Sequence, residues 1–157
     1  MSMIFKHLRV TQIIMLIVFS AGATLAYKQN TTTKQKNAMI LSEFSSISNH
    51  ADSYIFIVTG SWCSACKKSM PYLEKIHDEF NTIPIYAILY KDTEEKFKNA
   101  YQHHTLFKKI IVDQHLIDLL NFKTVPQIYV IKNNKVLHIN NSIDNESYTK
   151  IKQYLSH

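Results

Sequence analysis

The sequence contains few of the residues that interrupt or cross-link a chain. Among its 157 residues there are only two glycines, three prolines, two cysteines and one tryptophan. Such small numbers of glycine and proline exclude a low-complexity or linker-like chain. With 46% hydrophobic residues and no internal repeat, the sequence has the length and composition of one globular domain.

Arginine is scarce too, and this bears on the positive charge of the chain. The formal net charge is +6, yet Arg9 is the only arginine and the lysines are scattered rather than gathered in one stripe. Arginine is the usual reader of phosphates and base edges. A diffuse positive surface is a weak electrostatic footprint, so we expect no nucleic-acid partner.

A long uncharged segment follows the basic N-terminus. Lys6 and Arg9 precede residues 10–27, VTQIIMLIVFSAGATLAY, which end in small residues. This order is typical of a secretory signal, with cleavage expected after Ala23 or Ala26. The same segment is nearly long enough to span a bilayer as an uncleaved anchor. No cysteine follows it directly, which excludes a lipoprotein anchor.

Both interpretations of this segment place the rest of the protein outside the cytoplasm. We therefore expect a periplasmic location, with anchoring in the inner membrane by residues 10–27 if they are retained. Residues 28–38 are polar and unpatterned, as in a flexible tether. The predicted organisation is a signal peptide or signal anchor over 1–27, a tether over 28–38 and a folded domain over 39–157.

The predicted domain alternates strand-like and helical segments. Continuous runs of β-branched and aromatic residues, typical of strands buried on both faces, occupy residues 53–60 and 82–90, and residues 108–113 indicate a further short strand. Helical spacing of apolar residues occurs over 38–48, 66–80, 92–104, 114–122 and 145–157. Residues 126–140 indicate a hairpin that turns at Asn133-Asn134. This order predicts an α/β fold with a mixed sheet, parallel in its centre and antiparallel in its C-terminal hairpin, and helices on both faces.

Both cysteines lie in the stretch GSWCSACKK, residues 60–68. Cys63 directly follows a predicted buried strand and is expected at the first turn of the next helix, where backbone amides and the helix dipole stabilise a thiolate. The pKa of its thiol would fall from about 8.5 towards neutrality. Cys66 follows one turn later, further inside and within reach of the Cys63 sulfur. An exposed nucleophile backed by a sheltered resolving thiol is what thiol–disulfide exchange requires.

Two other interpretations of the cysteine pair remain open from the residues alone. A zinc site normally has four ligands, and the pair supplies two. The histidines that might complete such a site fit no compact spacing; they are His77, His103, His104 and His138. A purely structural disulfide is the second alternative, although a bridge over so short a loop constrains the unfolded chain weakly.

A proline at the start of a predicted strand is the second unusual feature. In TVPQIYVI, Pro126 is the first residue of an apolar, β-rich run. Proline lacks the N–H that a central ladder position needs, so it marks an edge strand, the first residue of a strand or a cis peptide bond.

The stretch WCSACKK, with Pro71 after it and TVPQIYVIKNNKVLHI about sixty residues further on, resembles the thioredoxin fold. More narrowly, it resembles the membrane-tethered extracytoplasmic thiol-disulfide oxidoreductases of the TlpA/ResA/CcmG type. The resemblance covers roughly residues 40–155. It implies an attacking Cys63, a resolving Cys66, a motif tryptophan at Trp62 and a cis-proline at Pro126.

That resemblance implies an enzyme that exchanges disulfides with partner proteins through Cys63 and Cys66. The partner would be held against Trp62 and the Val125-Pro126 backbone. No cofactor and no metal are implied. A reductive role with a transmembrane redox partner is favoured, as in cytochrome c maturation. A periplasmic oxidant or isomerase, and a non-enzymatic metal-handling protein on the same fold, are the alternatives.

Three positions depart from what related families carry. Many relatives have a glutamate where this chain has Ser69, and thioredoxin has a buried aspartate where this chain has Ile57. With both acids missing, proton transfer would fall to water, to another side chain or to the partner. A peroxidase of the same superfamily normally has a threonine three residues before its reactive cysteine, where Gly60 stands before Cys63.

Overall fold

The computed structural model describes residues 35, 37–49, 51–101 and 104–157. The predicted signal or anchor segment, 1–27, and most of the predicted tether lie outside these residues. Within the described ranges, no helix has the length and apolar character needed to cross a membrane. The chain divides into two compact units, 1–42 and 43–157. Residues 37–42 of the first unit are helical, and the fold described below is that of the second.

The second unit alternates strands and helices in the predicted order, after a helical start at residues 43–47. The elements are β1 (Ser53–Thr59), α2 (Ser64–Glu79), β2 (Ile85–Leu89), α3 (Glu94–Ala100), β3 (Phe107–Ile111), α4 (Gln114–Leu120), β4 (Gln127–Lys132), β5 (Lys135–Ile139) and α5 (Asn145–Ser156). A single 3-10 turn, His104–Leu106, precedes β3. The predicted succession of elements is therefore confirmed.

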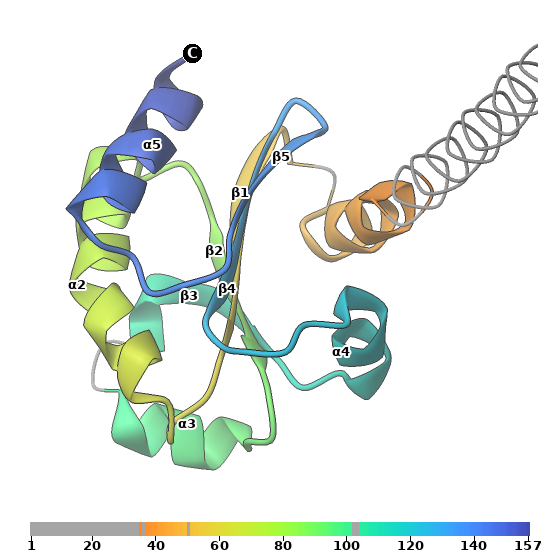
Figure 1. Cartoon of the computed structure of the whole chain (residues 1–157), viewed down its shortest axis with the longest axis vertical. Coiled ribbons are helices and arrows are strands. Elements are labelled where there is room, and N and C mark those ends of the chain that lie inside the picture. Colours follow the sequence, from red (N-terminus) through yellow and green to blue (C-terminus); the bar gives the residue numbers. More distant parts are fainter. Residues whose placement is uncertain (1–34, 36, 50, 102–103) are drawn as a thin grey trace, which may run out of the picture. The chain divides into compact units, whose positions relative to one another are not determined.

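The five strands form one mixed sheet in the order β3-β2-β1-β4-β5 (Figure 1). Strand β2 runs parallel to both β1 and β3, whereas β4 runs antiparallel to β1 and β5 antiparallel to β4. The β4–β5 turn is at Asn133 and Asn134, whose φ angles are 50° and 59°. Positive φ at both central residues is what a tight type I′ hairpin requires. The predicted mixed sheet with a C-terminal hairpin is confirmed.

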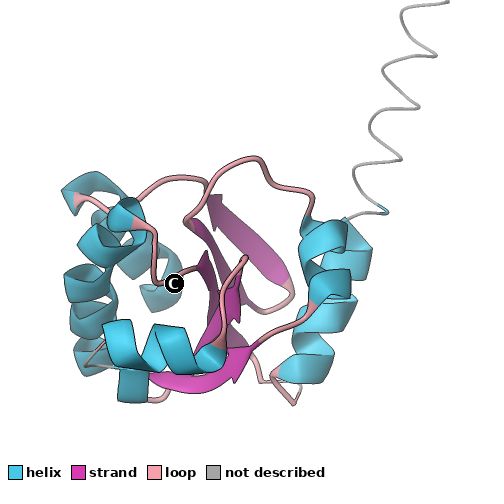
Figure 2. Ribbon diagram, turned by 90° about the horizontal axis from the view of Figure 1, so that it is seen from below, coloured by secondary structure: helices cyan, strands magenta, loops and turns pink. Residues whose placement is uncertain are grey.

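Helices cover both faces of the sheet (Figures 1 and 2). Two successive parallel crossovers lead in the same direction, from β1 to β2 and on to β3. Because such crossovers are right-handed, their helices α2 and α3 share one face. The main core agrees, since side chains from α2, α3 and α5 pack there with Ile55 and Ile57 of β1. Helix α4 lies on the opposite face, where the chain returns from β3 to β4.

The opposite face carries a row of rings across neighbouring strands. Tyr86, Phe56, Tyr129 and His138 are successive register partners on β2, β1, β4 and β5. The Phe56 and Tyr86 ring centroids are 4.8 Å apart, and Phe44 stacks on Phe56 at 4.1 Å. Phe56, Tyr86 and Tyr129 are buried, and burial raises the pKa of Tyr129 to about 12. Such ring pairs contribute about 0.5–1.5 kcal/mol each beyond their buried area.

Candidate active site

The junction of β1 and α2 positions the first cysteine. Strand β1 ends at Thr59 and α2 begins at Ser64, so Cys63 is the N-cap residue of a 16-residue helix. Its backbone is extended, and its Sγ accepts a hydrogen bond of 3.0 Å from the Cys66 N–H. The sulfur therefore lies at the positive end of the helix dipole, against an amide that the helix leaves unpaired. This is the position that the sequence predicts.

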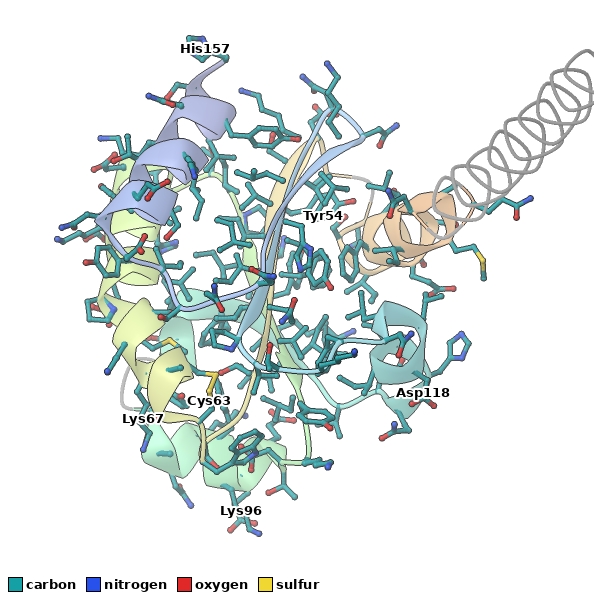
Figure 3. All side chains as sticks on the ribbon, viewed as in Figure 1. Tyr54, Cys63, Lys67, Lys96, Asp118 and His157 are labelled. Atoms are coloured by element: carbon teal, nitrogen blue, oxygen red, sulfur yellow. A yellow bond between two sulfur atoms is a disulfide. The ribbon has the colours of Figure 1, made fainter. Side chains whose placement is uncertain are left out.

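The two cysteines form a disulfide at the N-terminal end of α2 (Figure 3). The S–S distance is 2.10 Å and the Cα–Cα distance is 5.2 Å. Cys66 is fully buried, as expected, but Cys63 is only 5% exposed. The prediction of an exposed nucleophile is therefore wrong for the disulfide form. The reason is that the Cys63 Sγ lies between Cys66 and the Val125 carbonyl oxygen, which is 3.8 Å away.

The sheet topology brings the Val125-Pro126 segment to this disulfide. Strand β4 runs antiparallel to β1, and its first residue, Gln127, is the register partner of Val58 near the end of β1. The residues just before β4 therefore lie beside the residues just after β1. The Val125-Pro126 peptide bond is cis, as the resemblance implies. Pro126 is buried and Val125 half-buried.

Trp62 directly precedes Cys63 of the disulfide in the chain and is among the exposed large hydrophobic residues. It is 56% exposed, and its indole N–H donates a hydrogen bond of 3.1 Å to the Tyr90 carbonyl oxygen. Gly60 allows this placement, because a Cβ there would lie 2.7 Å from the Trp62 Nε1. The Tyr90 ring in turn meets the Phe122 ring edge-on at 5.0 Å. The indole is thus fixed at its polar end while more than half of the residue's surface stays exposed.

The segment before Cys63 is bound to the chain that follows β2. Three hydrogen bonds make this connection: Tyr90 N–H to Thr59 O (2.8 Å), Tyr101 Oη–H to Gly60 O (3.3 Å), and Ser61 N–H to the Asp92 carboxylate. In each bond, the two partners lie more than 30 positions apart in the chain. These hydrogen bonds fix the backbone that positions Trp62 and Cys63.

The sequence places Asp92 at the start of the predicted 92–104 helix, where it or Thr93 is expected to be the N-cap, and gives no sign of a role in the site. Thr93 is the N-cap residue of α3, and the Asp92 carboxylate accepts the backbone N–H groups of Ser61 and Thr93. Burial by itself would raise the pKa of Asp92, but these donors, with the nearby Lys96 charge, hold it below its ordinary value. Asp92 is therefore ionised at neutral pH and serves as an anchor for the loop.

Ser69 and Ile57, where relatives carry acids, both serve in packing. Ser69 is fully buried. Its hydroxyl donates to the Ala65 carbonyl oxygen at 3.3 Å and accepts the Ile143 N–H at 2.9 Å, which connects α2 to the segment before α5. Ile57 is fully buried in the core between the sheet and α2. Neither side chain carries a carboxyl group.

Replacing Ser69 by alanine is expected to destabilise the protein without slowing its thiol chemistry. The buried Ile143 N–H would lose its acceptor, which costs about 1–3 kcal/mol. Urea unfolding and the rate of disulfide reduction by dithiothreitol measure the two effects. Ser156→Ala is the matched control, because that exposed hydroxyl also bonds the carbonyl four residues earlier, at 2.8 Å. A large loss of rate at unchanged stability would instead give Ser69 a part in proton transfer.

No cluster of three or more potential metal ligands is found among the residues that the structure describes. Of the histidines considered for such a site, His138 contacts Gln127, with 2.7 Å between the His138 Nε2 and the Gln127 Oε1. His103 lies outside the described residues.

Comparison with known proteins identifies a family and a fold. Residues 26–139 match the AhpC/TSA family. No curated protein sequence matches the chain. Among solved structures, a secreted Mycobacterium tuberculosis disulfide oxidoreductase homologous to Escherichia coli DsbE is similar, with a TM-score of 0.57 and 13% identity over 65% of this chain and 81% of that one.

Two further structures have the same fold. Mycobacterium tuberculosis DsbF, solved in mixed oxidised and reduced forms, has a TM-score of 0.56 and 14% identity over 66% of this chain and 81% of that one. A thioredoxin-family thiol:disulfide interchange protein from Chlorobium tepidum has a TM-score of 0.56 and 16% identity over 66% and 79%. The predicted thioredoxin-like fold is confirmed.

Proposed function

The chain belongs to the AhpC/TSA family, and from this premise we propose that it exchanges disulfides with partner proteins through Cys63 and Cys66. Family and fold agree with the predicted class, a thioredoxin-like thiol-disulfide oxidoreductase. The observation that carries the proposal is the environment of the Cys63 sulfur. It accepts the Cys66 N–H at the start of α2 and faces the Val125 carbonyl oxygen.

The exchange proceeds through two balanced displacements. In the reduced protein, the Cys63 thiolate attacks one sulfur of the partner disulfide and forms a mixed disulfide, and the other partner sulfur leaves as a thiolate. The Cys66 thiolate then attacks the Cys63 Sγ and releases the first partner sulfur. The partner gains two electrons, and the protein is left with the Cys63–Cys66 disulfide. Run backwards, the same steps oxidise a partner dithiol.

The local structure supports each step of this sequence. The Cys66 N–H and the start of α2 stabilise negative charge on the Cys63 Sγ, both when it attacks and when it leaves. Cys66 is fully buried, so a partner protein reaches Cys63 first. We propose that the partner segment lies against Trp62 and pairs with the backbone at Val125 and Pro126.

We propose that the protein works outside the cytoplasm and in the reductive direction, as in the TlpA/ResA/CcmG group that the sequence resembles. Residues 10–27 would export it, or hold it at the inner membrane if uncleaved, and a transmembrane protein would supply electrons. A secreted protein among the similar structures supports the location. A periplasmic oxidant or isomerase is the alternative. Alkylation trapping of Cys63 and Cys66 in intact cells separates the two, since mostly reduced thiols support reduction and mostly oxidised thiols support the alternative.

The activity itself is tested with the full chain, insulin as the disulfide substrate and dithiothreitol as the electron source. Accelerated insulin reduction is expected, and no acceleration would overturn the proposal. A parallel assay with hydrogen peroxide tests the peroxidase reaction of the superfamily. We expect no peroxide consumption, because Gly60 stands where such enzymes carry threonine.

A further inference from the structure

Gln127 is a buried polar side chain two residues after Val125, whose carbonyl oxygen faces the Cys63 sulfur, and both ends of its amide are engaged. It is 3% exposed, directly follows Pro126 and is the first residue of β4. Its Nε2 donates to the Thr124 carbonyl oxygen at 2.6 Å, and its Oε1 lies 2.7 Å from the His138 Nε2. A single side chain thus connects the segment before the cis-proline to strand β5.

The chemistry of these partners fixes the orientation of the amide. A carbonyl oxygen only accepts, so the NH₂ end of Gln127 must face Thr124 and its oxygen must face His138. The Nε2 of His138 must then carry a proton. The Nε2–H group is also present when the His138 ring is protonated. The hydrogen bond from His138 to Gln127 is therefore possible for both the neutral and the charged ring. The His138 ring is itself held by stacking on Tyr129, at a centroid distance of 4.4 Å and an interplanar angle of 4°.

Holding the Thr124 carbonyl also orients the backbone N–H of Val125. The two groups belong to one peptide unit, and among the described residues only the Val125-Pro126 bond is cis. In a trans peptide the C=O and N–H point in opposite directions. With the Thr124 oxygen turned to the buried Gln127, the Val125 N–H points away from it. The next carbonyl, that of Val125, lies 3.8 Å from the Cys63 Sγ.

We propose that Gln127, oriented by His138, is a positioning residue that holds the Val125 backbone in the conformation that captures an extended partner segment beside Cys63. The inference rests on the proposed disulfide exchange and adds a residue to it. Gln127 touches neither sulfur in this arrangement. It acts through Thr124 and Val125, and therefore on partners that pair with the backbone.

Gln127→Met tests this, because methionine fills a similar volume and cannot donate to Thr124. Two rates are measured on the full-length protein: exchange with a cystine-containing peptide, and reduction of the Cys63–Cys66 disulfide by dithiothreitol, which is too small to need backbone pairing. Loss of one oriented hydrogen bond is expected to lower kcat/KM for the peptide roughly five- to tenfold, mainly through KM. The dithiothreitol rate should stay within about twofold.

Matched variants separate positioning from packing. Gln114→Met removes an exposed amide, which bonds Asp118 at 2.8 Å, and should change neither rate. Gln127→Glu keeps an acceptor for His138 but loses the donor to Thr124, so it should reproduce the selective loss. His138→Phe retains a ring to stack on Tyr129 and should give a smaller selective loss. These two variants also provide the test if Gln127→Met fails to fold.

The outcomes distinguish this inference from the function on which it rests. A selective loss of peptide exchange in the Gln127 variants supports positioning. Equal losses of both rates, or no loss in either, would overturn it and leave Gln127 a packing residue. A wild-type protein that reacts with dithiothreitol but exchanges with no peptide or protein disulfide would overturn the proposed function instead.

Discussion

Replacement of Cys63 by serine is expected to abolish disulfide exchange, lowering the rate by at least about a thousandfold. The hydroxyl cannot form the mixed disulfide, and the buried Cys66 cannot reach a protein partner in its place. The fold should survive, because Cys63 is the N-cap residue of α2 and serine is among the best residues at such a position. Insulin reduction with the full chain measures the loss, and urea unfolding checks the fold. Ser64→Ala, an exposed neighbour, is the control.

The companion variant Cys66→Ala should behave differently. It keeps the attacking thiol but loses the resolving one, so the mixed disulfide with the partner accumulates. Non-reducing electrophoresis and mass spectrometry would detect the adduct and place it on Cys63. Full activity of the Cys63→Ser variant would contradict the assigned roles, and so would an adduct formed through Cys66 in the wild-type protein.

The largest effect on stability is expected from restoring the missing acid, Ile57→Asp. Ile57 is fully buried on β1 between its register partners Ala87 and Ile128. A charged or unpaired carboxyl group in that core should lower the free energy of unfolding by about 3–5 kcal/mol at neutral pH. Burial would raise the pKa of this aspartate in the folded state. The folded protein then binds more protons than the unfolded one, so the loss should shrink as the pH falls towards the unfolded value.

Urea unfolding at neutral and mildly acidic pH measures this penalty. Ile57→Val is the control, since it removes one methylene and should cost only about 0.5–1.5 kcal/mol at any pH. An aspartate variant as stable as the valine variant would mean that water or an unseen partner reaches this position. The site could then accept the acid that its relatives use.

The sequence predicts the order of elements well because local patterns carry that information. Strands β1 and β2 are continuous apolar runs, and both are buried along nearly their whole length. The asparagine pair predicts the hairpin turn because asparagine tolerates the positive φ that the turn needs. The position of Cys63 follows from the same logic, as a helix that directly follows a buried strand must place its first turn at the strand's end.

The parts that could not be predicted depend on contacts between distant segments. Helix α3 ends at Ala100, short of the predicted end at 104, and the Tyr101 that caps it donates to the Gly60 carbonyl oxygen across the site. The local sequence at Asp92 predicts only the start of a helix. Its bond to Ser61 depends on the packing of the β2–α3 segment against the segment before Cys63. Gln127 and His138 meet because two antiparallel strands align them, which no local pattern specifies.

The placement of Trp62 has a spectroscopic consequence. It is the only tryptophan in the chain, and it directly precedes a cysteine of the disulfide. Its indole N–H is held by the Tyr90 carbonyl oxygen, while more than half of the residue's surface is exposed. A disulfide quenches a neighbouring indole, whereas two thiols quench it less. The molecule therefore carries its own fluorophore at the reacting bond, and its emission can follow electron transfer and partner docking without any label.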